Sequence, residues 1–215
     1  MKKYLSLIFL TVFLLTSCAA KKYPLNEKIS QIRENIFVYE NDDFSSDAYA
    51  EIREKEKQDD GYVGEMKKYM IFRVRFKKKN FQCAEIAFET NGIKYHNSFD
   101  FSPSSSFVSC ETEVSAFPES GFYAIITIDG EELPIEYVSV KKEGTKNYEE
   151  AISTCAEKEK ERIDKFIADK KYEIRVRLIE NGGFNFYYVG FITENTSVSF
   201  LLDAATCEIL SVKEN

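Results

Sequence analysis

His96 is the only histidine in this 215-residue chain, so a histidine-based metal site or a histidine-assisted nucleophile would have to be centred on it. Its context, Tyr95-His96-Asn97-Ser98-Phe99, is strand-like, and His96 is out of phase with the apolar positions around it. This alternation predicts a surface side chain. The sequence contains no G-x-S-x-G, P-loop, G-x-G-x-x-G or H-E-x-x-H motif. We therefore expect no catalytic residue and a protein that is not an enzyme.

Acidic side chains gather between Asn41 and Asp47 (NDDFSSD), where an oxygen-rich cation site would need them. The run lacks the glycine and the closing glutamate of an EF-hand loop, so weak calcium binding is only the minor alternative. The adjacent carboxylates of Glu131-Glu132 and Glu149-Glu150 are typical of solvated surfaces. We expect no metal site and no cofactor.

Five cysteines are present, and Cys18 is set aside below. The other four are an even number, for which three disulfide connectivities are possible. If each bridge stays inside one predicted module, the pairs are Cys83–Cys110 and Cys155–Cys207, each contributing about 2–4 kcal/mol. None of the four has the close C-x-x-C spacing of a zinc site.

The formal charge of −7 makes this protein a poor candidate for binding nucleic acid or anionic lipid surfaces, because affinity for phosphate comes from clustered Lys and Arg. The one basic cluster, Lys77-Lys78-Lys79, lies between two strand patterns and predicts a solvated turn. Tyr and Phe are abundant, which favours sheets. We expect no nucleic-acid partner.

The first eighteen residues, MKKYLSLIFLTVFLLTSC, combine two lysines, an apolar run too short to span a bilayer, and a cysteine after small residues. Leu15-Thr16-Ser17-Cys18 resembles the bacterial lipobox. The resemblance implies that residues 1–17 are a signal peptide, that Cys18 carries the lipid, and that the protein is anchored in the cell envelope. Removal of Lys2 and Lys3 changes the charge from −7 to −9. Ala19, and not Asp, follows the cysteine, and resemblance to the Gram-negative sorting pattern then implies the outer membrane more than the inner one.

Residues 18–65 are predicted to be a lipidated tether followed by an irregular or helical segment. Ile29, Ile32 and Ile36 recur at helical spacing, which predicts a short helix running into a strand at 35–39. The mixed charges from Asp47 to Lys57 predict an exposed helix, with disorder as the alternative for 40–65.

From Tyr69 the apolar period changes to two, and six strands are expected between Tyr69 and Val140. Asn91-Gly92 and Asp129-Gly130 supply the positive φ angles of tight hairpin turns. This spacing predicts that residues 66–142 form an all-β antiparallel sandwich, with the immunoglobulin-like arrangement as the commonest solution.

A helix capped by Thr145 or Asn147 is expected next, with Ile152, Cys155 and Ile163 on one face. Strands follow at 172–179, 184–193, 198–202 and 209–212. The closing segment Phe200 to Val212 (FLLDAATCEILSV) resembles the end of a PepSY domain, a small helix-plus-antiparallel-sheet module. The resemblance covers roughly residues 146–213, so a PepSY-like domain is expected at 146–215, and it implies a non-enzymatic domain that restrains proteases or binds peptides. Cys207 stands where that family has glycine, so either the turn differs or a Cys155–Cys207 bridge holds it.

The expected protein is thus an α+β, lipid-anchored envelope protein with two modules. We expect it to bind another envelope protein or a peptide, and to regulate or assemble an exported protease or surface complex. An envelope hydrolase or carbohydrate-active protein is one alternative, and a structural or host-facing surface lipoprotein is another.

Overall fold

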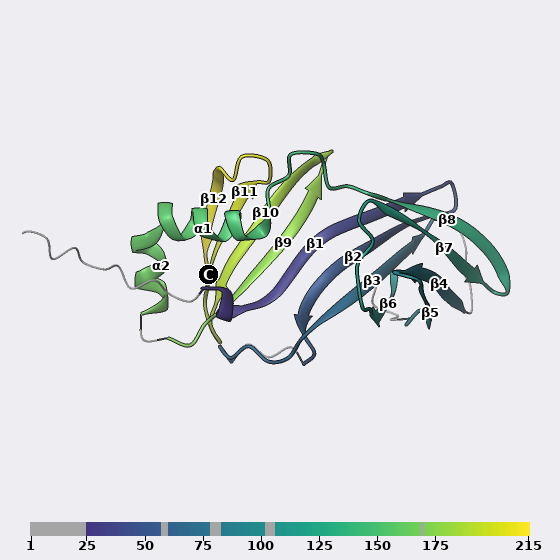
Figure 1. Cartoon of the computed structure of the whole chain (residues 1–215), viewed down its shortest axis with the longest axis horizontal. Helices are drawn as coiled ribbons and strands as arrows, with labels where there is room; N and C mark the ends of the chain where they lie inside the picture. Colours follow the sequence, from purple (N-terminus) through teal and green to yellow (C-terminus); the bar gives the residue numbers. More distant parts are fainter. Residues whose placement is uncertain (1–24, 57–59, 78–82, 102–105, 169) are drawn as a thin grey trace, which may run out of the picture.

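The computed structural model describes residues 25–56, 60–77, 83–101, 106–168 and 170–215, so Cys18 and the signal segment lie outside it. Within these ranges the chain is a mixed α+β protein dominated by strands (Figure 1). A 3₁₀ turn (Leu25–Lys28) precedes β1 (Ile29–Glu40), β2 (Phe44–Glu54), β3 (Met66–Phe76), β4 (Ala84–Thr90), β5 (Ile93–Ser98), β6 (Val108–Glu113), β7 (Gly121–Ile128) and β8 (Glu131–Ser139). The helices α1 (Tyr148–Lys158) and α2 (Lys160–Ile167) lead to β9 (Glu173–Asn181), β10 (Phe184–Ile192), β11 (Ser197–Asp203) and β12 (Ile209–Glu214).

Hydrogen bonds join these twelve strands into one sheet, and β1 is the strand that links its two ends. The first half of β1 pairs in parallel with β9, at Ile29 to Arg33. Its second half pairs with β8 at Phe37 and Val38, while β2 follows the other edge from Gln31 to Glu40. The structure therefore does not separate residues 66–142 into the two free-standing sheets of a sandwich.

One core lies between the β9–β12 end of the sheet and the two helices, which cross these strands in Figure 1. Ile152, Cys155 and Ile163 of the helices pack onto the inward residues of β9 to β11. Ile29 and Ile32 of β1 belong to the same core. The N-terminal strand is thus part of the C-terminal unit.

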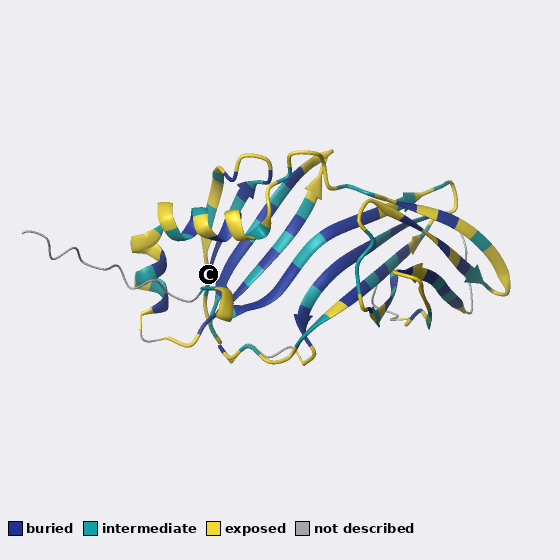
Figure 2. Ribbon diagram, in the orientation of Figure 1, coloured by how far each residue is buried: buried dark blue, intermediate teal, exposed yellow. Residues whose placement is uncertain are grey.

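The second core is rich in aromatic residues and lies where β8, β7 and β4 wrap over β2 and β3. Phe122 stacks on Tyr137 at a centroid distance of 4.8 Å, and Phe72 lies 4.9 Å from Phe88. Past the end of β5, Asp100 pairs with Ser109 of β6, so the strands around this core nearly close on themselves. Figure 2 shows the buried stripes along β1 and β2 that connect the two cores.

The two helices expected between residues 29 and 57 were wrong, because both segments are strands. In β1, a register shift between Ile29 and Gln31 inserts one residue. Ile29 and Ile32 can then both face one core at a spacing of three, which imitates a helical pattern. In β2, the inward positions include Ala48 and Ala50, whose small side chains hide the alternation.

The turn chemistry was predicted correctly. Asn91-Gly92 and Asp129-Gly130 have positive φ angles in the β4–β5 and β7–β8 hairpins. Asn147 caps α1, since its Oδ1 accepts from the backbone N–H of Glu150 at 2.8 Å.

The turn between β11 and β12 is organised by one carboxylate. Asp203 Oδ1 accepts from the N–H groups of Ala205 and Thr206, each at 2.9 Å, and from Thr206 Oγ1 at 3.1 Å. Hydrogen bonding by Thr206 lowers the pKa of Asp203. Cys207 follows at a φ of 57°, in the left-handed region that favours glycine.

Candidate functional site

One face of the sheet is covered by neither the helices nor the wrapped strands, and strand alternation determines which side chains it carries. On β3, Met70, Phe72 and Val74 face the aromatic core, so the intervening residues face the opposite way. On β9, Ile174, Val176 and Leu178 face the helices, so the residues between them also face the opposite way. Applied to β1, β2, β3, β6 and β9, this pattern defines a continuous surface that we term the open face.

The open face carries six of the seven arginines in the chain. They share it with one lysine and six carboxylates, so cations outnumber anions by one although the whole chain is acidic. The cations are Arg33, Arg53, Lys67, Arg73, Arg75, Arg175 and Arg177, and the carboxylates are Glu40, Asp47, Glu51, Glu111, Glu113 and Glu173.

Guanidinium groups stack on tyrosine rings across this surface. Tyr49 lies between two of them, with the Cζ of Arg33 at 4.2 Å and that of Arg73 at 4.4 Å from the ring centroid. Arg53 covers the ring of Tyr69 in the same way at 4.2 Å. Because such a stack contributes about 0.5–2 kcal/mol, depending on how far it is desolvated, these contacts help to fix the arginines in place on the sheet.

A buried polar chain connects β2, β1 and β9. Glu51 accepts a hydrogen bond from Gln31 Nε2 at 2.5 Å and lies 3.4 Å from Arg33. The oxygen of the same Gln31 amide accepts from Arg177 through Nε at 2.9 Å and through Nη2 at 2.5 Å. Arg53 completes the chain through a 2.6 Å ion pair to Glu111.

The positive charge of the arginines in this buried polar chain is only partly compensated by its carboxylates. Burial lowers the pKa of Arg33, and the carboxylate of Glu51 opposes that change. Burial also lowers the pKa of Arg177, with repulsion from Arg33 as the next cause. Within the part of the chain that the structure describes, Arg177 donates to the neutral Gln31 and makes no ion pair. An anion brought to this surface would relieve that imbalance.

Sequence reasoning missed the open face, although a signal was present. The tripeptide Arg-Val-Arg occurs twice, at 73–75 and at 175–177. In a strand, this spacing puts both arginines on one face and the valine on the other. Two such strands facing the same way predict an arginine-rich surface, but only the pairing through β1 and β2 shows that they belong to one sheet.

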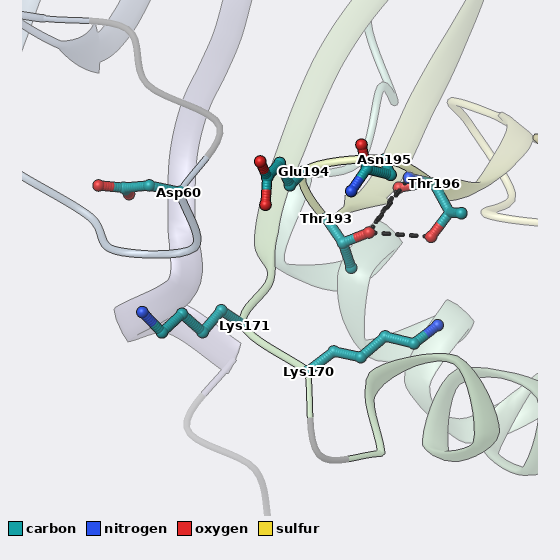
Figure 3. A pocket seen from close by; sticks show the side chains of 7 residues that line it. All are labelled: Asp60, Lys170, Lys171, Thr193, Glu194, Asn195 and Thr196. Atoms are coloured by element: carbon teal, nitrogen blue, oxygen red, sulfur yellow. Dashed lines mark hydrogen bonds between the residues drawn. The ribbon is translucent and has the colours of Figure 1, made fainter.

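A cavity of about 780 Å³ lies elsewhere, between the loop at Asp60, the segment that leads into β9 and the β10–β11 turn. In Figure 3, Lys170 and Lys171 extend in opposite directions, and Asp60 points away from the Thr193–Thr196 turn. Thr193 Oγ1 is engaged within that turn, 2.9 Å from Thr196 Oγ1. These side chains do not converge on one point, as the groups of a catalytic centre must.

The residues singled out from sequence are scattered. His96 is exposed on β5, with Nε2 at 3.2 Å from Glu85 Oε2. Asn41, at the start of the acidic run, caps the β1–β2 turn by accepting from the N–H groups of Asp43 and Phe44. No group of three or more His, Cys, Asp or Glu side chains in the described ranges is placed to hold a metal.

The four cysteines are free thiols in the structure, so neither expected bridge is present. Cys83 is exposed next to Asp129, whereas Cys110 is buried in the aromatic core. Cys155 and Cys207 are buried in the same helix-covered core without being bonded.

Comparison with known proteins returned nothing for this chain: no family model, no curated protein and no solved structure matches it. Among the described residues, the model contains no helix with the length and apolarity needed to cross a membrane.

Proposed function

We propose that this protein is a lipid-anchored envelope protein with a non-enzymatic binding role, and that the open face is its contact surface for an acidic segment of a partner protein. The observation that carries the proposal is the concentration of six of the seven arginines on one uncovered face of an acidic chain. Arg and Tyr are, with Trp, the residue types that are enriched at binding hot spots. The anchor rests on the lipobox resemblance at Cys18.

Preorganisation supports this role. The tyrosine stacks and the Gln31 hydrogen bonds hold the guanidiniums before any partner arrives, so little side-chain entropy is lost on binding. The exposed Arg75 extends the positive surface beyond the buried chain. Such a surface favours acidic partners and discriminates against basic ones.

At the level of fold families, we propose that the part from Tyr148 onward is PepSY-like and that residues 66–142 derive from an immunoglobulin-like sandwich. The helix pair, the four antiparallel strands after it and the Asp203–Cys207 turn support the first assignment. The aromatic core enclosed by β2, β3, β4, β7 and β8 supports the second.

Affinity capture tests the proposal. The lipidated protein, purified with its anchor, is used to capture partners from the envelope of its own cells, and the partners are identified by mass spectrometry. We expect Arg75→Glu to reduce partner recovery about tenfold, since it reverses one exposed charge of the open face. Arg162→Glu on α2 is the matched control, because Arg162 is the one arginine outside that face.

Recovery of the same partners at the same level by wild type and Arg75→Glu would overturn the assignment of the surface. Capture of no partner by the wild-type protein would overturn the binding role itself.

A further inference from the structure

A small cavity of about 140 Å³ opens between β1, β2 and β9 and is lined by Ser30, Gln31, Arg53, Glu54, Arg175 and Arg177. The strand register builds it, because Gln31 is paired with Arg53 on one side and with Arg175 on the other. Three guanidiniums from two different strands therefore surround a single buried amide. The volume is below that of sites for drug-sized ligands and suits a group of a few atoms.

Two nearly inaccessible groups in the lining have unused hydrogen-bonding capacity. Ser30 is 3% exposed, and its Oγ has no hydrogen-bond partner among the described residues. Arg53 is 4% exposed, and its Nε is likewise unpartnered, lying 3.8 Å from the nearest Glu51 oxygen. Leaving a buried polar group unsatisfied costs about 1–3 kcal/mol. The Arg53 Nε–H can only donate and the Ser30 hydroxyl can also donate, so one acceptor would satisfy both groups.

The charge of the lining indicates which acceptor fits. Three guanidiniums and one carboxylate line the cavity, and that carboxylate, Glu54, accepts from the backbone N–H of Gly64 in the neighbouring loop. Arg53 is already paired with Glu111 at 2.6 Å and Arg175 with Glu173 at 3.4 Å, so Arg177 is the lining arginine that makes no ion pair among the described residues. Burial raises the pKa of Glu54, because desolvation disfavours its charged form. A singly charged, planar carboxylate matches paired guanidinium N–H groups, whereas a phosphate dianion adds repulsion.

We propose that this cavity is a carboxylate-binding subsite. It takes one Asp or Glu side chain, or the C-terminal carboxylate, of a partner segment lying on the open face. Arg177 and Arg53 donate to the carboxylate oxygens, and the Ser30 hydroxyl supplies a further donor. The inference rests on the proposed binding role of the open face and adds to it the chemical group that is recognised.

Acetate is the probe, titrated into the mature protein and followed by the ¹H–¹⁵N signals of the Gln31 side-chain amide and the arginine Nε–H groups. We expect saturable shifts at Gln31, Arg53 and Arg177, and weaker binding of inorganic phosphate at the same pH. Arg177→Gln should weaken acetate binding at least tenfold. Arg162→Gln on α2 should leave it unchanged.

Ser30→Ala keeps the test independent of folding defects. It removes a buried hydroxyl that has no partner, so stability should be equal or higher, while acetate affinity should fall several-fold. Unmoved Gln31 and Arg177 signals, equal affinity in Arg177→Gln and Arg162→Gln, or tighter binding of phosphate than of acetate would each overturn the subsite.

The two proposals fail in distinguishable ways. If acetate binds as expected but no envelope partner is captured, the subsite stands and the binding role of the open face fails. If Arg177→Gln and Ser30→Ala capture the partner as well as the wild type does, the binding role stands and the subsite fails.

Discussion

At the scale of single residues, burial determines how reactive a side chain is, and the cysteines show this most clearly. Burial raises the pKa of Cys110 and of Cys155 to about 12. Only roughly one thiol in ten thousand is then ionised at pH 8, and the thiolate is the reactive form. Cys83, in contrast, is exposed to solvent beside Asp129.

Native alkylation with iodoacetamide at pH 8 should therefore modify Cys83 at least tenfold faster than Cys110, Cys155 or Cys207. In denaturant all four should react, because unfolding removes the burial. Peptide mapping by mass spectrometry without reduction measures both. A recovered peptide that links Cys155 to Cys207 would contradict the free thiols of the structure and restore the bridge expected from sequence.

Among the elements, α1 is the one whose start can be attributed to a single side chain. Asn147 Oδ1 satisfies the N–H of Glu150, one of the four donors at the helix start that have no partner within the helix. The same segment is fastened to the sheet, since Tyr187 Oη donates to the carbonyl of Lys146 at 2.7 Å.

Asn147→Ala should lower the free energy of unfolding by about 1 kcal/mol, because the cap is lost. Asn147→Ser retains a capping oxygen and should change the stability by much less. Urea denaturation followed by circular dichroism measures both variants. Equal stability of Asn147→Ala and the wild type would show that the helix–sheet contacts alone define the start of α1.

For the whole molecule, the important feature is that both cores share β1. Ile32 packs under the helices, whereas Phe37 packs in the aromatic core, only five residues further along the same strand. Because β1 contributes to both cores, loss of its pairing at one end of the sheet should weaken the pairing at the other end. The two parts should therefore unfold together.

Leu178→Ala, in the helix-covered core, should lower the stability by about 2–5 kcal/mol and shift one calorimetric transition of the whole protein. Hydrogen exchange in β7, which belongs to the other core, should accelerate as well. Leu210→Ala is the control, because Leu210 is exposed on β12. Two separate transitions, with β7 unaffected, would show that the cores are independent.

Much of the local structure could be predicted from sequence. The ten strands after Tyr69, both Asx-Gly hairpins, the Asn147 cap and the Asp203 turn all follow from short-range chemistry. The sequence failed at β1 and β2, where inserted residues and alanines hide the period of two.

By itself, the sequence determined the strands from Tyr69 onward, the turns and the acidic character, because each depends on neighbouring residues or on composition. It did not predict that the expected single helix divides at Glu159 into α1 and α2. It also carries the lipobox pattern at Cys18, from which we predict the anchor. Only the tertiary structure decided that β1 serves both cores, that the cysteines stay apart, and that two distant Arg-Val-Arg strands form one open face with a cavity between them. Those features depend on pairing between strands that are far apart in sequence, as in Ile29 of β1 with Ile174 of β9, and strand pairing at that range leaves no local trace.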